Sequence, residues 1–392
     1  MDVQMAQRLQ QLPPYLFADL RRQMAEARAR GTKVIRIDIG DPDQPTPDPV
    51  VAELCRAITD EADPDRHRYG CDRPVEALKG AVADFYRRRW GVSLRREQIV
   101  ITMGSKDAIV KFAMGVLDPG DLGIAPAPGY PTYNIGHVLA GAATYQVPLR
   151  AAEGFLPELE AIGQEVRRLA KVLWLNYPNN PTTAVAPLEF FQRAVEFGRR
   201  HNILIAHDSA YSENTYDGYR APSILQVAGA EEVAVEFFSL SKAFNMTGWR
   251  VGCVVGNASA VKALATVQEN VDNGQLRPIQ FAAAVALNRA EELIGPINTV
   301  YQRRRDLVVN ALNAKGWSLA KPKATIYVWA PVPQRFAGDS GAFAARLLEQ
   351  TGVMVTPGRG YGQWGEGYFR IALTYPDAVL AEAMERIAGM SL

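Results

Sequence analysis

The stretch SLSKAFNMTGWR, residues 239–250, carries the clearest structural signal in this sequence of 392 residues. Lys242 directly follows Ser241 in it, with Ser239 shortly before and Arg250 shortly after. An amine beside hydroxyl groups and a second cation suits a lysine that bonds to a carbonyl cofactor whose phosphate is held nearby. A Ser-x-Ser-Lys run is also common in solvated turns, so the rest of the chain must decide between the two interpretations.

The stretch lies between two short apolar runs, and such runs recur along the middle of the chain. The runs are Gln98–Thr102, Lys171–Leu175, Ile203–Ala206, Val233–Phe238 and Val251–Val255. Longer segments with helical spacing separate them, and Leu188–His201 is the clearest of these because its apolar residues share one face. Strands that alternate with helices predict an α/β fold with a mostly parallel, buried sheet.

The same patterns divide the chain into three parts. We expect residues 50–285 to form a large α/β domain, and residues 286–392 to form a smaller α+β domain with a helix from about Tyr301. Further elements of the small domain are a strand at Ala324–Trp329, a helix at Gly341–Thr351 and a strand at Tyr368–Leu373. Residues 1–49 contain an amphipathic helix, Leu16–Arg30, and an apolar run, Val34–Ile39, and we expect this segment to pack on the small domain.

Composition narrows the function classes. Lys and Arg total 43 against 42 Asp and Glu, so no net field favours nucleic acid or a membrane surface. No apolar run approaches the roughly 18 residues of a membrane span, and we expect no targeting segment. Cys55, Cys71 and Cys253 are far apart and odd in number, which argues against disulfides and zinc and favours a reducing cytoplasm. The four histidines lack ligand spacing, so we expect no bound metal.

Polar residues follow several of the predicted strands. Gly104, Ser105 and Lys106 come after Gln98–Thr102 and open a predicted helix, where free N–H groups can hold a phosphate. The prolines of Asn176–Pro181 fix a rigid loop that can aim an asparagine amide into a cleft. In open α/β sheets the ligand lies beyond the carboxyl ends of the strands, so both segments are candidates for a binding site. Each is also a common cap or turn.

Asp208 follows the buried run Ile203–Ala206, where a carboxylate is costly unless a cation neutralises it. A protonated pyridine nitrogen would supply that cation, and the pairing would keep the ring able to accept electrons from a substrate. One crossover and one further strand separate Asp208 from Lys242, so we expect both at one edge of the sheet. Pyridoxal 5'-phosphate combines the required pyridine ring, aldehyde and phosphate.

Several motifs in order give the chain a resemblance to the class I and II aminotransferases, the fold-type I pyridoxal phosphate enzymes. The motifs are Gly40–Asp43, Tyr130–Tyr133, Asn176–Pro181, Asp208–Tyr211, Ser239–Arg250 and Phe369–Leu373. They extend over almost the whole chain. The resemblance implies a large domain with a seven-stranded, mostly parallel sheet between helices, and a smaller α+β domain. It also implies amino transfer in two half-reactions through pyridoxamine phosphate.

The resemblance implies roles for individual residues. Lys242 is expected to bond to the cofactor and act as catalytic base, with Asp208 and Tyr211 as its catalytic partners. Arg370 is expected to grip the substrate α-carboxylate with its planar guanidinium. The other expected cofactor contacts are Gly104, Ser105, Lys106, Tyr130, Asn180, Ser239, Ser241, Arg250 and, from a neighbouring subunit, Tyr69. The other expected substrate contacts are Tyr15, Gly40, Asp72 and Asn180. A homodimer with shared active sites follows from the role of Tyr69.

Within the family, the resemblance is strongest to the subfamily that acts on LL-diaminopimelate, for which 2-oxoglutarate would be the acceptor. It is seen at Leu12–Phe17, Phe155–Pro157, Asn245–Arg250 and Gly365–Ile371. Two places depart from the pattern. Cys71–Pro74 stands where a glutamate and a glycine are usual, and Thr183 stands where a glycine is usual. Asp72 would suit a distal ammonium group, whereas Arg73 beside it would favour a carboxylate.

These departures keep a second hypothesis open, in which the chain is a pyridoxal phosphate enzyme that eliminates, replaces or cyclises its substrate. A third hypothesis is a non-catalytic module on the same fold. The intact set of Lys242, Asp208, Tyr211 and Arg370 argues against the third.

Overall fold

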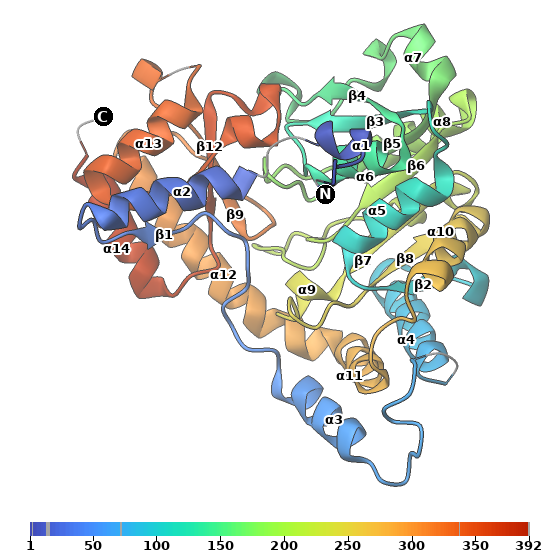
Figure 1. Cartoon of the computed structure of the whole chain (residues 1–392). Coiled ribbons are helices and arrows are strands. Elements are labelled where there is room, and N and C mark those ends of the chain that lie inside the picture. Colours follow the sequence, from blue (N-terminus) through green and yellow to red (C-terminus); the bar gives the residue numbers. More distant parts are fainter. Residues whose placement is uncertain (2, 13–15, 71–72, 337, 391–392) are drawn as a thin grey trace.

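The computed structural model describes residues 1, 3–12, 16–70, 73–336 and 338–390 (Figure 1). Its centre is a seven-stranded sheet with the order β2-β8-β7-β6-β5-β3-β4. The strands are β2 (Ile99–Thr102), β3 (Leu122–Ala127), β4 (Ala143–Pro148), β5 (Ala170–Asn176), β6 (Leu204–Asp208), β7 (Ala234–Ser239) and β8 (Gly252–Gly256). Only β8 runs antiparallel to its neighbours. The predicted mostly parallel sheet is confirmed.

Helices cover both faces of this sheet. The helices α4 (Arg73–Trp90), α8 (Leu188–His201) and α11 (Arg277–Asn288) pack on one face, and α5 (Ser105–Val116), α6 (Thr132–Ala140) and α10 (Ala258–Val271) pack on the other. Strand β5 contributes Leu173 and Leu175 to the first core, and Val172 and Trp174 to the second. Because alternate side chains are buried on both sides, the strand reads as an unbroken apolar run in the sequence.

A second region is built on a three-stranded antiparallel sheet with the order β11-β12-β9. Its strands are β9 (Tyr327–Pro331), β11 (Thr356–Pro357) and β12 (Tyr368–Ala372), and its helices are α12 (Ala290–Asn313), α13 (Ser340–Thr351) and α14 (Asp377–Ala388). Together they enclose an apolar core of their own.

The N-terminal segment packs on this second region. The helix α2 (Leu16–Ala29) buries Leu20 and Met24 against Leu348 of α13, and the short strand β1 (Ile35–Arg36) pairs in parallel with β10 (Val353–Met354). Only two residues of the apolar run Val34–Ile39 therefore belong to a strand. Beyond Ile37 the backbone carbonyls serve side chains of the second region instead of a neighbouring strand.

Helix α12 joins the two regions. It contributes Leu293 and Ile294 to the core under the large sheet, and Ile297 and Tyr301 to the core of the second region. The expected start at about Tyr301 is wrong, because the helix begins at Ala290 and continues through Pro296. Apolar burial on both sides of the proline outweighs the hydrogen bond that it removes. The division of the chain at residues 49 and 285 stays a proposal.

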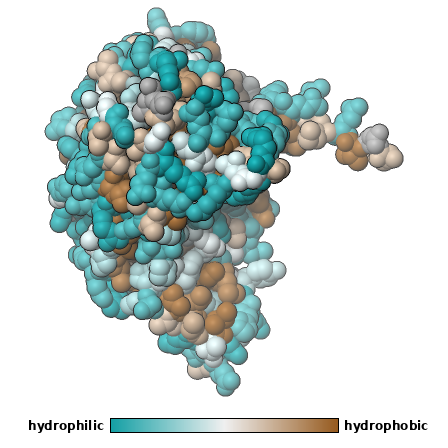
Figure 2. Space-filling view, turned by 90° about the vertical axis from the view of Figure 1, so that its left-hand side faces the viewer, coloured by the Kyte–Doolittle hydropathy of each residue, from teal (hydrophilic) through white to brown (hydrophobic). Residues whose placement is uncertain are grey.

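Four short or peripheral helices complete the fold: α1 (Gln7–Gln10), α3 (Asp48–Thr59), α7 (Gln164–Leu169) and α9 (Leu240–Ala243). Figure 2 shows a largely hydrophilic face, on which hydrophobic side chains gather toward the lower end, at the height of α3. Val51 and Ile58 of α3 are among the exposed apolar residues. Within the described parts of the chain, no helix has the length and apolar character needed to cross a bilayer.

Candidate active site

A cavity of about 820 Å³ lies at the carboxyl ends of three neighbouring strands of the large sheet. Asn176, Asp208 and Ser239, the last residues of β5, β6 and β7, line it from one side. Tyr327 of β9 and Arg370 of β12 line it from the second region. Polar residues from distant parts of the sequence therefore meet between the two sheets.

Asp208 is a buried carboxylate with one satisfied and one free oxygen. Its Oδ2 accepts a hydrogen bond from the Tyr133 hydroxyl at 2.7 Å. Its Oδ1 is buried and has no partner among the described residues. Burial raises the pKa of this carboxyl to about 6, against the lowering effect of the Tyr133 hydrogen bond. A cation placed at Oδ1 would lower that pKa and supply the missing contact.

Lys242 lies in α9, directly after β7, and its Nζ donates a hydrogen bond to the Gly40 carbonyl at 2.7 Å. The pKa of this amine is lowered to about 8, chiefly by burial; the charge of Asp41 opposes the shift and that of Arg370 adds to it. The amine is therefore more often neutral near physiological pH than that of an exposed lysine, as a nucleophile or base requires. A Cβ at Gly40 would collide with the Tyr327 hydroxyl, so only glycine fits there.

Arg370 is buried and held from several sides. Its Nη1 donates to Asn180 Oδ1 at 2.7 Å, and its Nη2 donates to the Asp38 carbonyl at 2.8 Å. The guanidinium carbon lies 3.9 Å from the centre of the Tyr327 ring, a cation–π contact. The Arg370 Nε is buried without a partner in the described part of the chain. A fixed guanidinium with a spare donor is suited to bind an anionic group.

The end of β5 and the loop that follows it connect Asp208 to Arg370 by hydrogen bonds. Asn176 donates from Nδ2 to the Asp208 carbonyl at 2.8 Å, and its Oδ1 accepts from the backbone N–H of Asn180 at 2.8 Å. Asn180 in turn contacts Arg370. Tyr211, whose hydroxyl lies 3.0 Å from that of Tyr327, and Tyr130 also line the cavity.

Further residues could hold a phosphate. Ser105 and Lys106 begin α5, where backbone N–H groups are unpaired by the helix, and both line the cavity. Ser239, Ser241 and Arg250 line it as well. Gly104 does not line the cavity, but it allows Arg250 to approach, because a Cβ there would lie 2.8 Å from Arg250 Nη2. Its φ of 78° is also one that glycine adopts readily.

Thr183, the departure from the usual glycine, lies in the left-handed region with a φ of 63°. Its backbone N–H still donates to the Asn179 carbonyl at 3.0 Å. The chain thus keeps the turn that a glycine would form and places a β-branched residue in a strained conformation.

Some predicted residues lie elsewhere. Tyr69 is 71% exposed and is not among the residues that line the cavity of its own chain. Tyr15 and Asp72 lie outside the described residues. Their expected roles stay predictions.

Five further residues, to which the sequence patterns assign no role, lie at or beside the cavity: Asp38, Asp41, Tyr133, Tyr327 and Tyr361. Tyr133 and Asp41 belong to the motifs Tyr130–Tyr133 and Gly40–Asp43, so the sequence did point to both as site residues. Tyr327 sits within an apolar run and carries no such signal.

Comparisons with known proteins agree with this geometry. A family model described as aminotransferase class I and II matches residues 32–387. The LL-diaminopimelate aminotransferase of Moorella thermoacetica is 50% identical over 386 residues, which cover 98% of each chain. That of Gloeobacter violaceus is 48% identical over 389 residues, or 99% of this chain and 98% of the relative.

Solved structures are similarly close. Substrate-bound BacF from Bacillus subtilis superposes with a TM-score of 0.92 at 35% identity, covering 99% of this chain and 98% of that one. A single mutant of Thermus thermophilus aspartate aminotransferase gives a TM-score of 0.90 at 29% identity over 99% of each chain. The predicted fold and transferase class are confirmed. The chain belongs to the class I and II aminotransferases, fold-type I enzymes whose amino transfer depends on pyridoxal phosphate.

Proposed function

We propose that this aminotransferase binds pyridoxal 5'-phosphate and transfers an amino group from LL-diaminopimelate to 2-oxoglutarate. One observation carries the cofactor assignment: the lowered-pKa amine of Lys242 and the partnerless oxygen of Asp208 line the same cavity as Arg370. The relatives that are named LL-diaminopimelate aminotransferases and match almost the full chain support the substrate.

The cavity residues fit this cofactor. A pyridinium N–H would supply the donor and the charge that Asp208 Oδ1 lacks, and Tyr133 would hold the other oxygen in place. Tyr130 would stack on the ring, and Tyr211 and Asn180 would bind its hydroxyl group. The phosphate would be held by Ser105, Lys106, Ser239, Ser241 and Arg250, with Gly104 making room for Arg250.

When bound, pyridoxal phosphate supplies an electron sink for the substrate Cα. Lys242 would hold the cofactor, and its amine, whose pKa is lowered to about 8, would remove and return the proton at the substrate Cα. The Gly40 carbonyl gives the freed amine a fixed resting place. Arg370 binds the substrate carboxylate and orients the Cα–H bond, with Asn180 holding the guanidinium.

The distal end of the substrate remains part of the proposal. Tyr15 and Asp72, both outside the described residues, are the proposed contacts there, together with Gly40 beside the reacting centre. An acidic Asp72 would favour the distal ammonium group of a diamino acid.

We also propose a homodimer in which Tyr69 reaches the phosphate of the neighbouring active site. Its exposure, and that of apolar residues such as Val51, Ile58, Val271 and Leu276, supports such an interface. The free thiols of Cys55 and Cys253 support a reducing, cytoplasmic location.

The test is reconstitution of the purified chain with pyridoxal phosphate, followed by incubation with LL-diaminopimelate and 2-oxoglutarate. Glutamate should form, and Lys242→Ala should abolish both the absorbance of the lysine-bound cofactor and glutamate formation. Absence of glutamate, with ammonia, replacement or cyclised product from another amino acid, would instead establish the eliminating, replacing or cyclising enzyme.

A further inference from the structure

Residues 38–46, which we call the 38–46 segment, connect β1 to α3 and touch two active-site side chains through backbone carbonyls. The Asp38 carbonyl accepts from Arg370 Nη2 at 2.8 Å, and the Gly40 carbonyl accepts from Lys242 Nζ at 2.7 Å. No helix or strand includes these residues. Their positions therefore depend on side chains that hold the segment from outside.

The two ends of the segment are anchored by hydrogen bonds. Thr374 donates to the Ile39 carbonyl at 2.8 Å, and the Tyr375 hydroxyl accepts from the Ile39 N–H at 3.3 Å. At the other end Thr46 donates to the Asn245 carbonyl at 2.8 Å, and Asn245 Nδ2 donates to the Pro45 carbonyl at 3.4 Å. Between these anchors lies Asp43.

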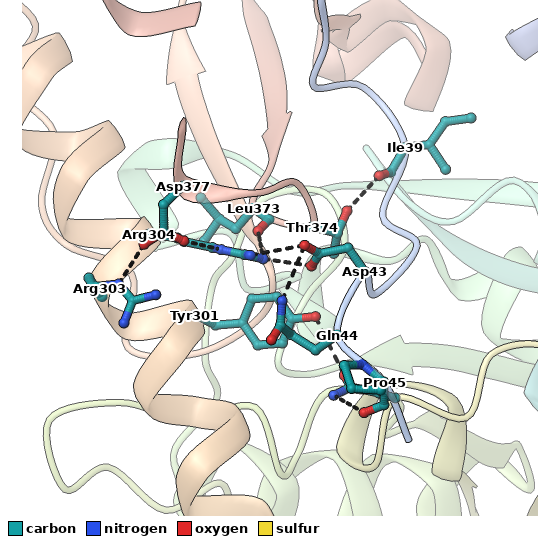
Figure 3. Close-up of polar contacts among 11 residues, drawn as sticks. Ile39, Asp43, Gln44, Pro45, Tyr301, Arg303, Arg304, Leu373, Thr374 and Asp377 are labelled. Carbon is teal, nitrogen blue, oxygen red and sulfur yellow. Dashed lines mark hydrogen bonds and ion pairs between the residues drawn. The ribbon is translucent and has the colours of Figure 1, made fainter. Parts of the chain in front are cut away.

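Arg304 of α12 holds Asp43 with both arms of its guanidinium. Nη1 lies 2.6 Å from Oδ1 and Nη2 lies 2.9 Å from Oδ2. Two further donors are also used, since Nη1 reaches the Leu373 carbonyl at 3.1 Å and Nε reaches Asp377 Oδ1 at 2.8 Å. Figure 3 shows Arg304 between Asp377 on one side and Asp43 on the other. The Arg304 side chain is only 2% exposed.

Because two parallel hydrogen bonds join the Arg304 guanidinium to the Asp43 carboxylate, they fix the orientation of that carboxylate as well as its distance. The helix that carries Arg304 is rigid, because it is buried in both cores of the molecule. Asp43 follows Gly40 closely, so its position limits where the Gly40 carbonyl can lie. The same contact limits Asp38 through the shared backbone.

We propose that Arg304, acting through Asp43, is a positioning residue for the reaction: it fixes the 38–46 segment so that its carbonyls stay against Lys242 and Arg370. The consequence for amino transfer rests on the function proposed above, whereas the effect on the Lys242 amine does not. Arg304 itself is not among the residues that line the active-site cavity.

The neighbouring residue provides a matched control. Arg303 lies on the same helix and also bonds to Asp377, at 2.6 Å, but its described contacts do not include Asp43. Its side chain is 59% exposed. Arg303→Met therefore removes a cation and a bond to Asp377 without releasing the 38–46 segment.

The first measurement uses the cofactor-free protein. Lys242 acetylation by acetic anhydride is followed by peptide mass spectrometry at several pH values, with the exposed Lys262 as internal standard. Loss of a fixed acceptor disfavours the ammonium form, so Arg304→Met and Asp43→Asn should each speed acetylation of Lys242 near neutral pH about threefold. Arg303→Met should match the wild-type protein.

The second measurement uses the reconstituted enzyme with LL-diaminopimelate. We expect kcat/KM to fall about tenfold in Arg304→Met and Asp43→Asn, because a shift of the resting amine and of Arg370 misaligns the reacting groups. Arg304→Lys keeps the charge and one bond, and should restore part of the loss. The double variant should lose little more than either single one, since both act through one contact.

Equal Lys242 acetylation in folded Arg304→Met and Arg303→Met proteins would overturn the proposal. If Arg304→Met does not fold, Asp43→Asn and Arg304→Lys decide in the same way. A wild-type enzyme that is inactive on LL-diaminopimelate would disprove the proposed substrate, while the acetylation measurement would still judge the role of Arg304.

Discussion

Tyr133 donates a hydrogen bond to Oδ2 of Asp208, a residue that lines the active-site cavity, at 2.7 Å and leaves the buried Oδ1 without a partner among the described residues. The phenol cannot easily turn away, because its ring stacks on Trp174 with centroids 4.9 Å apart. Trp174 is itself fixed by a 3.0 Å hydrogen bond from its Nε1 to His137. This stack sets which carboxylate oxygen is free for a cofactor.

Tyr133→Phe should therefore lower kcat/KM about tenfold, the effect of losing a hydrogen bond to a charged group. In the wild-type protein the hydrogen bond from Tyr133 favours the ionised form of Asp208. Removing the Tyr133 hydroxyl therefore raises the pKa of that carboxyl. The acid limb of the kcat/KM profile should accordingly move to higher pH.

The control is Tyr177→Phe, which removes an equally short hydroxyl contact, 2.7 Å to the Phe155 carbonyl, from a residue that does not line the cavity. It should change stability but not the pH profile. Coincident acid limbs in Tyr133→Phe and wild-type enzyme would show that Tyr133 does not tune Asp208.

The large sheet could be predicted because its strands are buried on both faces. Ile203–Ala206, for example, shows no polar interruption, and the polar residues at its end, Asp208 above all, mark the ligand-binding edge. Boundaries were predicted less well where tertiary burial overrides a local signal. Helix α12 continues through Pro296 since apolar residues on both sides of it are buried.

Tyr327 shows why part of the site could not be predicted. Its role comes from the register of β9 and β12, in which Arg370 pairs with Trp329 and Ala372 pairs with Tyr327. Tyr327 is thus the diagonal neighbour of Arg370 on the same face of the sheet. Nothing in the apolar run around Tyr327 reveals that pairing, just as nothing in either segment reveals the contact between Arg304 and Asp43.

Thr183→Gly should stabilise the protein by about 1 kcal/mol, because it removes the backbone strain of a β-branched residue with a φ of 63°. The gain is reduced by the greater freedom of glycine in the unfolded chain. Thermal unfolding of the cofactor-free protein measures the effect, and Thr182→Gly serves as the control. Thr182 has buried hydrogen bonds to Asn179 Oδ1, so that control should destabilise. A lower melting temperature for Thr183→Gly would show that the turn is not strained.

Glu236→Gln should destabilise the protein by about 3 kcal/mol, since it removes one charge from a fully buried network. Glu236 Oε2 accepts from Ser223 Oγ at 2.8 Å and from the Ile224 N–H at 3.1 Å, and lies 2.9 Å from His207 Nδ1. The Tyr86 hydroxyl donates to Oε1 at 2.8 Å. An amide nitrogen cannot accept any of these hydrogen bonds.

Denaturant unfolding of Glu236→Gln should be compared with Glu232→Gln, whose side chain is 66% exposed and pairs with Arg199. The exposed substitution should change the free energy of unfolding by less than about 1 kcal/mol. Similar losses in both variants would mean that the buried carboxylate contributes no more than a surface ion pair.

Lys242→Met should stabilise the cofactor-free protein at neutral pH, because burial disfavours the charged amine in the folded state. The folded pKa is about 8, below the usual value of 10.5. Below about pH 8 the amine is charged in both states, so the wild-type protein bears the full penalty. Between about 8 and 10.5 the unfolded state binds more protons, so wild-type stability rises with pH. The difference in melting temperature between Lys242→Met and wild type should therefore shrink across this window. A constant difference from pH 7 to 10.5 would show that the Lys242 amine has an ordinary pKa in the folded enzyme.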